Sequence, residues 1–139
     1  MCIRDRVDRL RRARAASPYL LAAVLAGAGA LHFVMPQPYD DLIPSWLPGS
    51  ARSWVYGSGV AELAAAVGVA VPRTRRISAT GTALLFVAVF PGNIEMAVDP
   101  GDTPRWLALA RLPLQIPLVL WALQVRRAAQ STRRSDKVR

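Results

Sequence analysis

The chain alternates between arginine-rich ends and long apolar stretches. Four stretches have the length of a membrane helix, and each holds only one charged or histidine side chain: residues 19–35, 54–71, 77–98 and 106–125. A helix rises about 1.5 Å per residue, so about 20 residues cross a hydrocarbon core about 30 Å thick. A soluble bundle would show polar stripes at a 3.6-residue period, but these stretches are apolar nearly all round. The pattern predicts four transmembrane helices.

The segments outside these stretches differ in charge. Fifteen Lys and Arg residues lie in residues 1–17, the 72–76 loop and residues 126–139, whereas two lie on the other side. The positive-inside rule then predicts basic cytoplasmic tails at 1–17 and 126–139, which flank a transmembrane domain at 18–125. A cleaved signal peptide is the alternative at the N-terminal end, but more membrane-length segments follow and no A-x-A site ends the first stretch. We expect an all-α, integral membrane, antiparallel four-helix bundle with both termini inside (N-in/C-in).

The first outer loop, residues 36–53, is too apolar for an ordinary solvated loop. Its four prolines exclude a long helix, yet it contains five large apolar or aromatic side chains: Tyr39, Leu42, Ile43, Trp46 and Leu47. We expect a short interfacial helix and turns that form a lid over the outer end of the bundle, with Trp46 and Leu47 at the membrane interface. The alternative is an ordinary extracellular loop with chance aromatic residues.

Composition and charge exclude several classes of protein. The chain has 139 residues, enough for one domain, and is 53% hydrophobic with a formal net charge of +9. A disordered chain would not be so apolar, and the basic residues flank the apolar stretches instead of lining a folded face, which argues against nucleic acid as a partner. One cysteine and one histidine exclude a disulfide framework, a CxxC redox pair and a multi-histidine metal site. We therefore expect no metal. The excess of arginine over lysine, 17 to 1, is typical of a GC-rich bacterial genome.

Polar side chains inside the hydrocarbon are costly and mark helix contacts or functional sites. Five of them fall at similar depth in the outer half of the predicted bilayer: His32, Glu62, Asn93, Arg111 and Gln115. His32 and Glu62 share helix faces with small residues, which mark close helix contacts, so both should point into the bundle. Glu95 lies on roughly the opposite face from Asn93 and is expected to reach the outer surface. The cluster either only holds the helices together or forms a ligand-binding or catalytic pocket.

Glu62 and Arg111 are expected to face each other across this cluster. Each is the only charged residue of its stretch, their signs are opposite, and their depths differ by only about 4 Å. An unpaired buried ion keeps its desolvation penalty, which favours pairing. The alternative is that Arg111 turns outward and Glu62 is protonated.

Five runs, in this order, resemble the DoxX-like family of bacterial membrane proteins. They are LHFVMPQPYDDLIPSWLPG (31–49), VYGSGVAELAAAVGV (55–69), PRTRR (72–76), VFPGNIEMA (89–97) and RLPLQIPLVLWA (111–122). The resemblance covers roughly residues 20–125 and implies a four-helix protein of the bacterial cytoplasmic (inner) membrane. Because some members are linked to thiosulfate:quinone oxidoreduction, it also implies a quinone substrate and a redox partner protein. The motifs give weight to eight residues: His32, Pro36, Tyr39, Pro44, Glu62, Asn93, Arg111 and Gln115.

The residues themselves limit what this resemblance can imply. There is no cysteine pair, Rossmann glycine pattern or pair of axial haem ligands, so we expect no intrinsic cofactor. Our first hypothesis is a membrane subunit that binds a small lipophilic ligand, with quinone as the candidate, in an outer-leaflet pocket. The candidate ligand-binding residues are His32, Tyr39, Glu62, Asn93, Arg111 and Gln115. There, His32 or Glu62 would exchange protons with a quinone oxygen and Arg111 would stabilise negative charge. The second hypothesis is a non-catalytic structural or assembly subunit; whether the chain is an enzyme, and its oligomeric state, stay open.

Overall fold

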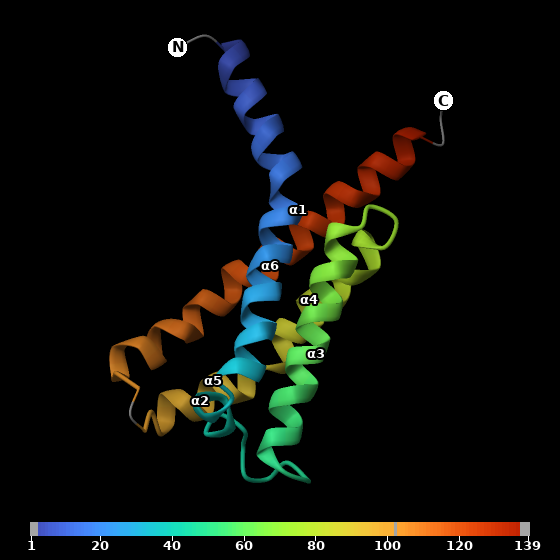
Figure 1. Ribbon diagram of the computed structural model, residues 1–139. Coiled ribbons are helices and arrows are strands. Elements are labelled where there is room, and N and C mark those ends of the chain that lie inside the picture. The colour runs from blue at the N-terminus through green and yellow to red at the C-terminus, as the bar shows by residue number, and fades with distance from the viewer. Residues whose placement is uncertain (1–2, 102, 137–139) are drawn as a thin grey trace.

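The computed structural model describes residues 3–101 and 103–136 and builds them from helices and connecting loops (Figure 1). Residues 1–2, 102 and 137–139, which belong to the predicted tails and to the second outer loop, lie outside the described residues. The helices are α1 (Ile3–Val34), α2 (Gln37–Asp40), α3 (Ala51–Ala70), α4 (Arg75–Ala88), α5 (Phe90–Val98) and α6 (Arg105–Asp136). The prediction of an all-α protein is confirmed.

The two terminal helices extend beyond the apolar stretches from which they were predicted. α1 and α6 have 32 residues each and continue into the arginine-rich ends of the chain. Arginine and alanine are good helix formers, so these basic segments extend the helices instead of ending them. The helices also run on through Pro18 in α1 and through Pro113 and Pro117 in α6. The segments predicted as tails are therefore helical in their described parts.

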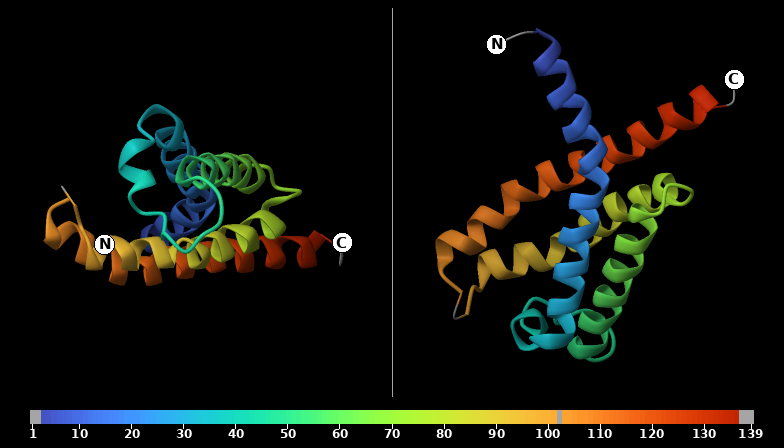
Figure 2. Two further views of the ribbon diagram at one scale, coloured as in Figure 1. Left: turned by 90° about the horizontal axis from the view of Figure 1, so that it is seen from below. Right: turned by 45° about the horizontal axis from the view of Figure 1, so that its top comes forward.

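The helices pack as two pairs in two layers (Figure 2). α1 packs against α3, α6 packs against α4 and α5, and a further contact between α3 and α4 joins the two pairs. Where the pairs meet, buried apolar side chains from α1, α3, α4 and α6 form one core, which includes Leu21, Leu25, Val69, Phe86 and Val125. This core holds the four long elements together.

α1 and α3 approach each other backbone to backbone at two glycines. A Cβ atom added at Gly29 would lie 3.0 Å from the carbonyl oxygen of Gly59, and one added at Gly59 would lie 2.9 Å from the Cβ of His32. Small residues allow such close approach between helices. The contact fixes His32 on α1 and Glu62 on α3 against each other.

The stretch predicted as one helix at 77–98 is divided at Val89, between α4 and α5. Pro91 stands at the start of α5 and has no N–H to donate to the preceding turn, which favours a break there. Gly92 follows, and a Cβ atom at Gly92 would lie 2.9 Å from the carbonyl oxygen of Leu42. The break therefore coincides with the place where the first outer loop rests on α5.

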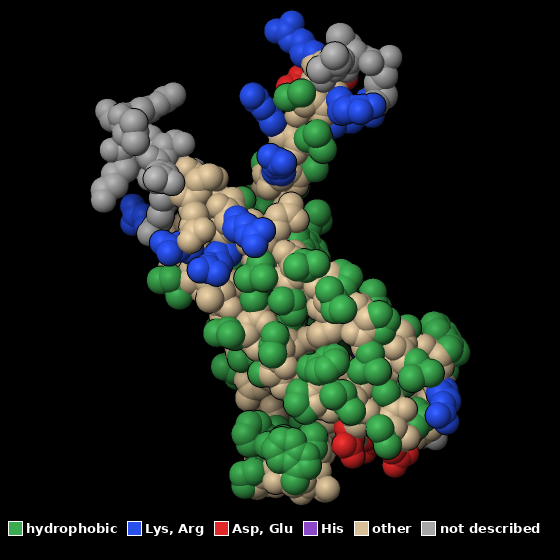
Figure 3. Space-filling view, turned by 180° about the vertical axis from the view of Figure 1, so that it is seen from behind, with side chains coloured by type: hydrophobic (Ala, Val, Ile, Leu, Met, Phe, Trp, Pro, Cys, Tyr) green, Lys and Arg blue, Asp and Glu red, His purple; other side chains and the backbone are tan. Residues whose placement is uncertain are grey.

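Three helical segments are long and apolar enough to cross a membrane: Arg4–Val34, Arg75–Val98, which combines α4 and α5, and Arg105–Ser131. α3, which covers the second predicted stretch, is not among them. Large apolar side chains stay exposed on all of these elements, among them Leu20, Val67, Leu84, Ile116 and Leu120. Hydrophobic side chains also cover much of the face seen in Figure 3. Continuous apolar surface of this kind is unusual for a soluble monomer, so the chain has the character of a membrane protein.

The two ends of the molecule differ in charge. Both termini and the 71–74 turn lie at one end, and the 35–50 and 99–104 loops lie at the other (Figure 1). In the space-filling view the Lys and Arg side chains gather mostly at the end of the termini, whereas acidic side chains are seen at both ends (Figure 3). The charge asymmetry along the sequence therefore becomes an asymmetry between the two ends of the fold.

Candidate functional site

A cavity of about 580 Å³ lies at the end of the molecule opposite the chain termini. Its polar lining includes one residue from each of four helices and one from the first outer loop: His32 (α1), Glu62 (α3), Asn93 (α5), Arg111 (α6) and Tyr39. The remaining lining is largely apolar, with Leu42, Ile43, Pro44, Trp46 and Leu47 on the loop side. The structure thus brings five of the six predicted site residues to one cavity.

His32 and Glu62 form a buried contact in the wall of the cavity. Each residue is 8% exposed, and Nδ1 of His32 lies 3.4 Å from Oε2 of Glu62. The same Nδ1 lies 2.8 Å from the carbonyl oxygen of Ala28. Because a carbonyl only accepts, Nδ1 is the donor of this hydrogen bond. Oε2 of Glu62 has no hydrogen-bond partner among the described residues, so it can still accept a hydrogen bond from a ligand.

The predicted face-to-face pair of Glu62 and Arg111 is not formed in the described structure. Glu62 pairs with His32 instead, and Nη1 of Arg111 lies 3.7 Å from the sulfur of Met96. The physical reason is helix packing, since α3 packs on α1 and α4 whereas α6 packs on α4 and α5. Similar depth in the membrane does not bring two side chains together when their helices face different neighbours. Both side chains still line the cavity.

Tyr39 covers the imidazole of His32 from the loop side. The two rings are stacked, with centroids 4.1 Å apart and planes 24° apart. Burial raises the pKa of the Tyr39 phenol above its ordinary value; the positive charge of Arg111 opposes this shift and the carboxylate of Glu62 adds to it. The phenol is therefore neutral around pH 7 and keeps its O–H proton as a hydrogen-bond donor at the cavity.

Gln115 is the one predicted site residue that does not line the cavity. It is 7% exposed, and its Nε2 donates to the carbonyl oxygen of Phe86. Its Oε1 therefore faces Asn93, whose Nδ2 donates to it over 3.0 Å. This orientation uses the amide nitrogen of Asn93 and leaves the Asn93 carbonyl oxygen available as an acceptor. Gln115 is a positioning residue behind the cavity wall.

The predicted lid contains a short helix, α2, followed by turns, and it ends at Ser50, because Ser50 caps α3 by accepting from the N–H of Ser53. We use "lid" for residues 36–50. Asp40 in the lid accepts three hydrogen-bond contacts from Arg52 at 2.5–3.1 Å. This hydrogen bonding to Asp40 raises the pKa of the Arg52 guanidinium, so the guanidinium stays charged.

A second contact ties the far end of the lid to α3. The indole N–H of Trp54 donates to the carbonyl oxygen of Pro48 over 2.8 Å. Trp54 itself lines the cavity. The lid is therefore held at both ends by residues of the first turn of α3, over the mouth of the cavity.

Ser58 belongs to the cavity but was not among the predicted site residues. It lines the cavity, and its buried hydroxyl oxygen has no hydrogen-bond partner among the described residues. The signal was its place one turn before Glu62 on the same helix face. Glu95, by contrast, is exposed and lies outside this cavity. No group of three or more His, Cys, Asp or Glu residues in the described part of the chain could hold a metal ion.

Comparison with known proteins corrects the resemblance drawn from the sequence. The model of a family described as a domain of unknown function (DUF8561) matches residues 21–126, and no curated protein or solved structure gives a match. The assignment to the DoxX-like proteins was wrong. Its motifs consist of small residues, prolines and aromatic residues. Small residues are common where membrane helices pack closely, and aromatic residues are common at membrane interfaces, so these motifs occur in many membrane proteins. Because the match covers most of the chain, the protein belongs to the family of the domain of unknown function DUF8561.

Proposed function

We propose that this chain is an integral membrane protein that binds a small lipophilic ligand in the cavity under the lid. One observation carries the proposal: a largely apolar cavity of about 580 Å³ holds Tyr39, Arg111 and a buried Glu62 whose Oε2 has no hydrogen-bond partner in the described part of the chain. Small-molecule sites are typically apolar clefts of about 300–1,000 Å³ with a few convergent polar groups. A pocket of this composition suits a ligand with an apolar body and a few polar oxygens.

The polar groups suggest how such a ligand would be oriented. The Tyr39 hydroxyl and the Arg111 guanidinium are donors for a ligand carbonyl or hydroxyl oxygen. The carbonyl oxygen of Asn93 and the carboxylate of Glu62 are acceptors for a ligand hydroxyl. A quinone is a compound of this class, because its two oxygens stand on an apolar ring and become hydroxyls on reduction. Any redox role would need a partner protein as electron donor or acceptor, with His32 and Glu62 placed to exchange protons.

In this proposal the protein is a four-helix transmembrane bundle with both termini in the cytoplasm. α3 would be the fourth span, because its 20 residues are long enough for a core of about 30 Å. The arginine-rich end would face the cytoplasm by the positive-inside rule. The lid would lie at the outer interface, with Trp46, which is 71% exposed, and Leu47 among the lipid head groups. A bacterial cytoplasmic membrane is the proposed location.

A structural or assembly subunit is the second candidate. Two contacts favour it, because His32 with Glu62 and Asn93 with Gln115 each join two helices directly. In that case the polar groups would serve mainly to hold the helices together. Removing a donor that faces only the cavity distinguishes the two candidates.

The test uses decylubiquinone as the probe and the protein in phosphatidylcholine nanodiscs. Trp46 and Trp54 line the cavity, so binding should quench tryptophan fluorescence. Tyr39→Phe removes only the hydroxyl and should weaken binding about tenfold, as expected for a lost hydrogen bond of about 1.4 kcal/mol, with an unchanged melting temperature. The control is Tyr19→Phe at the opposite end of α1, and it should bind like the native chain.

The outcomes separate the proposals. No saturable quenching by decylubiquinone would reject the quinone, and extraction of the protein from its native membrane would then identify other bound lipophiles by mass spectrometry. Equal binding by native chain and Tyr39→Phe would contradict the cavity as the site. A lowered melting temperature in Tyr39→Phe, with no bound lipophile in the native chain, would favour the structural subunit.

A further inference from the structure

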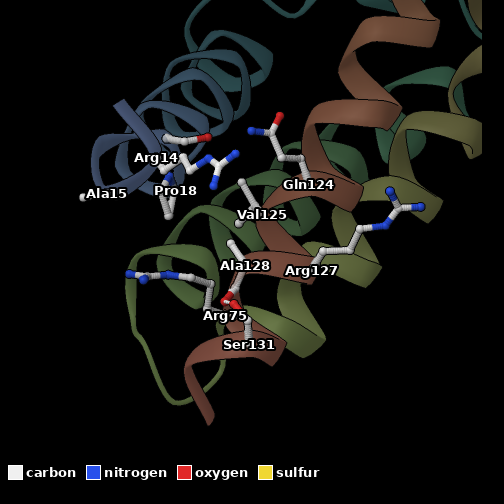
Figure 4. A pocket seen from close by; sticks show the side chains of 11 residues that line it. Arg14, Ala15, Pro18, Arg75, Gln124, Val125, Arg127, Ala128 and Ser131 are labelled. Atoms are coloured by element: carbon white, nitrogen blue, oxygen red, sulfur yellow. Dashed lines mark hydrogen bonds between the residues drawn. The ribbon is translucent and has the colours of Figure 1, made fainter. Parts of the chain in front are cut away.

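A second cavity, of about 550 Å³, lies at the end where the termini emerge, between α1, α4 and α6 (Figure 4). Each of the three helices contributes one arginine to it: Arg14, Arg75 and Arg127. Among the described residues that line it, none is acidic. Three positive charges from three helices at one hollow make a site for an anion.

Arg75 is held in place by neutral groups. Its Nε donates to the carbonyl oxygen of Val69 and its Nη2 to that of Ala70, each over 2.8 Å. Its guanidinium also lies over the ring of Tyr19, 5.1 Å from the centroid. These contacts fix the side chain but do not neutralise its charge, and they leave Nη1 able to donate. Arg75 is therefore a fixed positive charge beside the cavity.

Arg14 and Arg127 are exposed, and no ion pair among the described residues neutralises either of them. In Figure 4 Arg14 reaches from α1 toward α6, whereas the side chains of Arg75 and Arg127 extend in opposite directions. An extended anionic group fits this spread of donors better than a single small ion, because several oxygens can contact separate arginines.

Ser17 adds a neutral donor to the same cavity. The indole N–H of Trp121 donates to its Oγ over 2.9 Å. An indole can only donate, so this bond uses an acceptor site of Ser17 and leaves its hydroxyl proton free for a ligand oxygen. The amide of Gln124 also lines the cavity and provides further hydrogen-bonding capacity.

The cavity lies where the basic segments of α1 and α6 meet their apolar stretches. Directly after Pro18, which lines the cavity, Tyr19 and Leu20 are 55% and 58% exposed, and Leu120 of α6 is 59% exposed. A molecule with an anionic head and apolar chains could place its head among the arginines and its chains along this exposed apolar surface. A soluble anion would use only the first of these features.

We propose that this cavity binds the phosphate head group of an anionic glycerophospholipid, with Arg14, Arg127 and the fixed Arg75 as its cationic contacts. Basic pockets between membrane helices on the cytoplasmic side are suited to such head groups. The proposal rests on the proposed membrane orientation, which puts this end at the cytoplasmic leaflet, but it does not depend on any ligand of the cavity under the lid. Failure of quinone binding under the lid would therefore leave the lipid site standing.

The test uses the full chain in detergent, stripped of lipid, with phosphatidylglycerol as the probe and phosphatidylcholine as the neutral comparison. Native mass spectrometry during a titration measures bound lipid. Arg14→Gln/Arg127→Gln should weaken phosphatidylglycerol binding roughly 30-fold, taking about 1 kcal/mol for each arginine. The matched control, Arg6→Gln/Arg12→Gln, removes two exposed arginines of α1 that lie outside the cavity and should bind like the native chain. Arg75 is left unchanged because it also caps the end of α3.

The lipid site is supported if the native chain binds phosphatidylglycerol in preference to phosphatidylcholine and only Arg14→Gln/Arg127→Gln loses this preference. An equal loss in both double variants would show diffuse attraction to basic helices and overturn it. Titrations with inorganic phosphate and with sn-glycerol 3-phosphate distinguish the source of the anion. If inorganic phosphate or sn-glycerol 3-phosphate binds as tightly as phosphatidylglycerol, the cavity is a site for a soluble anion and the lipid proposal fails. A circular-dichroism melt of each variant checks that lost binding does not reflect unfolding.

Discussion

The imidazole Nδ1 of His32 lies 3.4 Å from the carboxylate Oε2 of Glu62, where two glycines bring α1 and α3 into backbone contact. A Cβ at Gly59 would lie 2.9 Å from the Cβ of His32, and a Cβ at Gly29 would lie 3.1 Å from that of Glu62. The glycines therefore do more than pack two helices. They set the separation of the only histidine from a buried carboxylate on the wall of the cavity.

Glu62 should be energetically coupled to His32 and not to Arg111. In a double-mutant cycle of His32→Gln and Glu62→Gln, the changes in the free energy of unfolding should be non-additive by about 0.5–3 kcal/mol, as for residues in contact. The parallel cycle of Glu62→Gln and Arg111→Gln should be additive within about 0.5 kcal/mol. Unfolding in mild detergent, followed by circular dichroism, measures both. Larger coupling in the second cycle would mean that Glu62 pairs with Arg111 after all.

Gly29→Ala should destabilise the protein, because the new methyl group would meet the Gly59 carbonyl and the Glu62 side chain. Forcing a methyl into such a contact typically costs about 1–3 kcal/mol. Gly27→Ala is the matched control on the same helix, since nothing lies within 4 Å of a Cβ there. It should leave stability unchanged or raise it by up to about 1 kcal/mol through helix propensity. Equal melting temperatures for both variants would contradict the close approach of α1 and α3.

The Asp40–Arg52 pair should keep the lid closed. Arg52→Gln removes the charged contacts and should speed backbone hydrogen exchange in residues 37–47 roughly two- to fivefold, the modest effect expected of a partly exposed ion pair. High salt should act in the same direction on the native chain by screening the charges. Arg105→Gln, an exposed arginine at the same end of the molecule, is the control. Exchange that is indifferent to Arg52→Gln would show that other contacts hold the lid.

The proposed orientation predicts where each loop lies. A reporter fused after Arg76, in the loop with three arginines, should be found in the cytoplasm, and one fused after Asp99 should be found in the periplasm. Alkaline phosphatase and a fluorescent protein report these compartments in opposite ways. The reverse pattern would place the lid and its cavity at the cytoplasmic face. It would also move the arginine cavity away from the inner leaflet and remove the basis of the lipid proposal.

Much of the cavity lining could be predicted because polar residues in apolar helices are few. Their estimated depth in the membrane was enough to select four residues that line the cavity: His32, Glu62, Asn93 and Arg111. Gln115 shared the same depth but turns toward Phe86 and Asn93. Depth follows from counting residues along a helix, whereas the direction of a side chain depends on how the helix is rotated against its neighbours. The family resemblance failed because its motifs were features that many membrane helices share.

The sequence by itself determined the helical class, the apolar segments and the charge difference between the two ends, because each follows from residue type and spacing along the chain. The tertiary structure alone decided that Glu62 meets His32 and not Arg111 and that Gln115 lies behind the cavity wall. These features depend on which helices touch and at what distance. Packing sets both through contacts such as Gly29 with Gly59, between residues that are distant in the sequence.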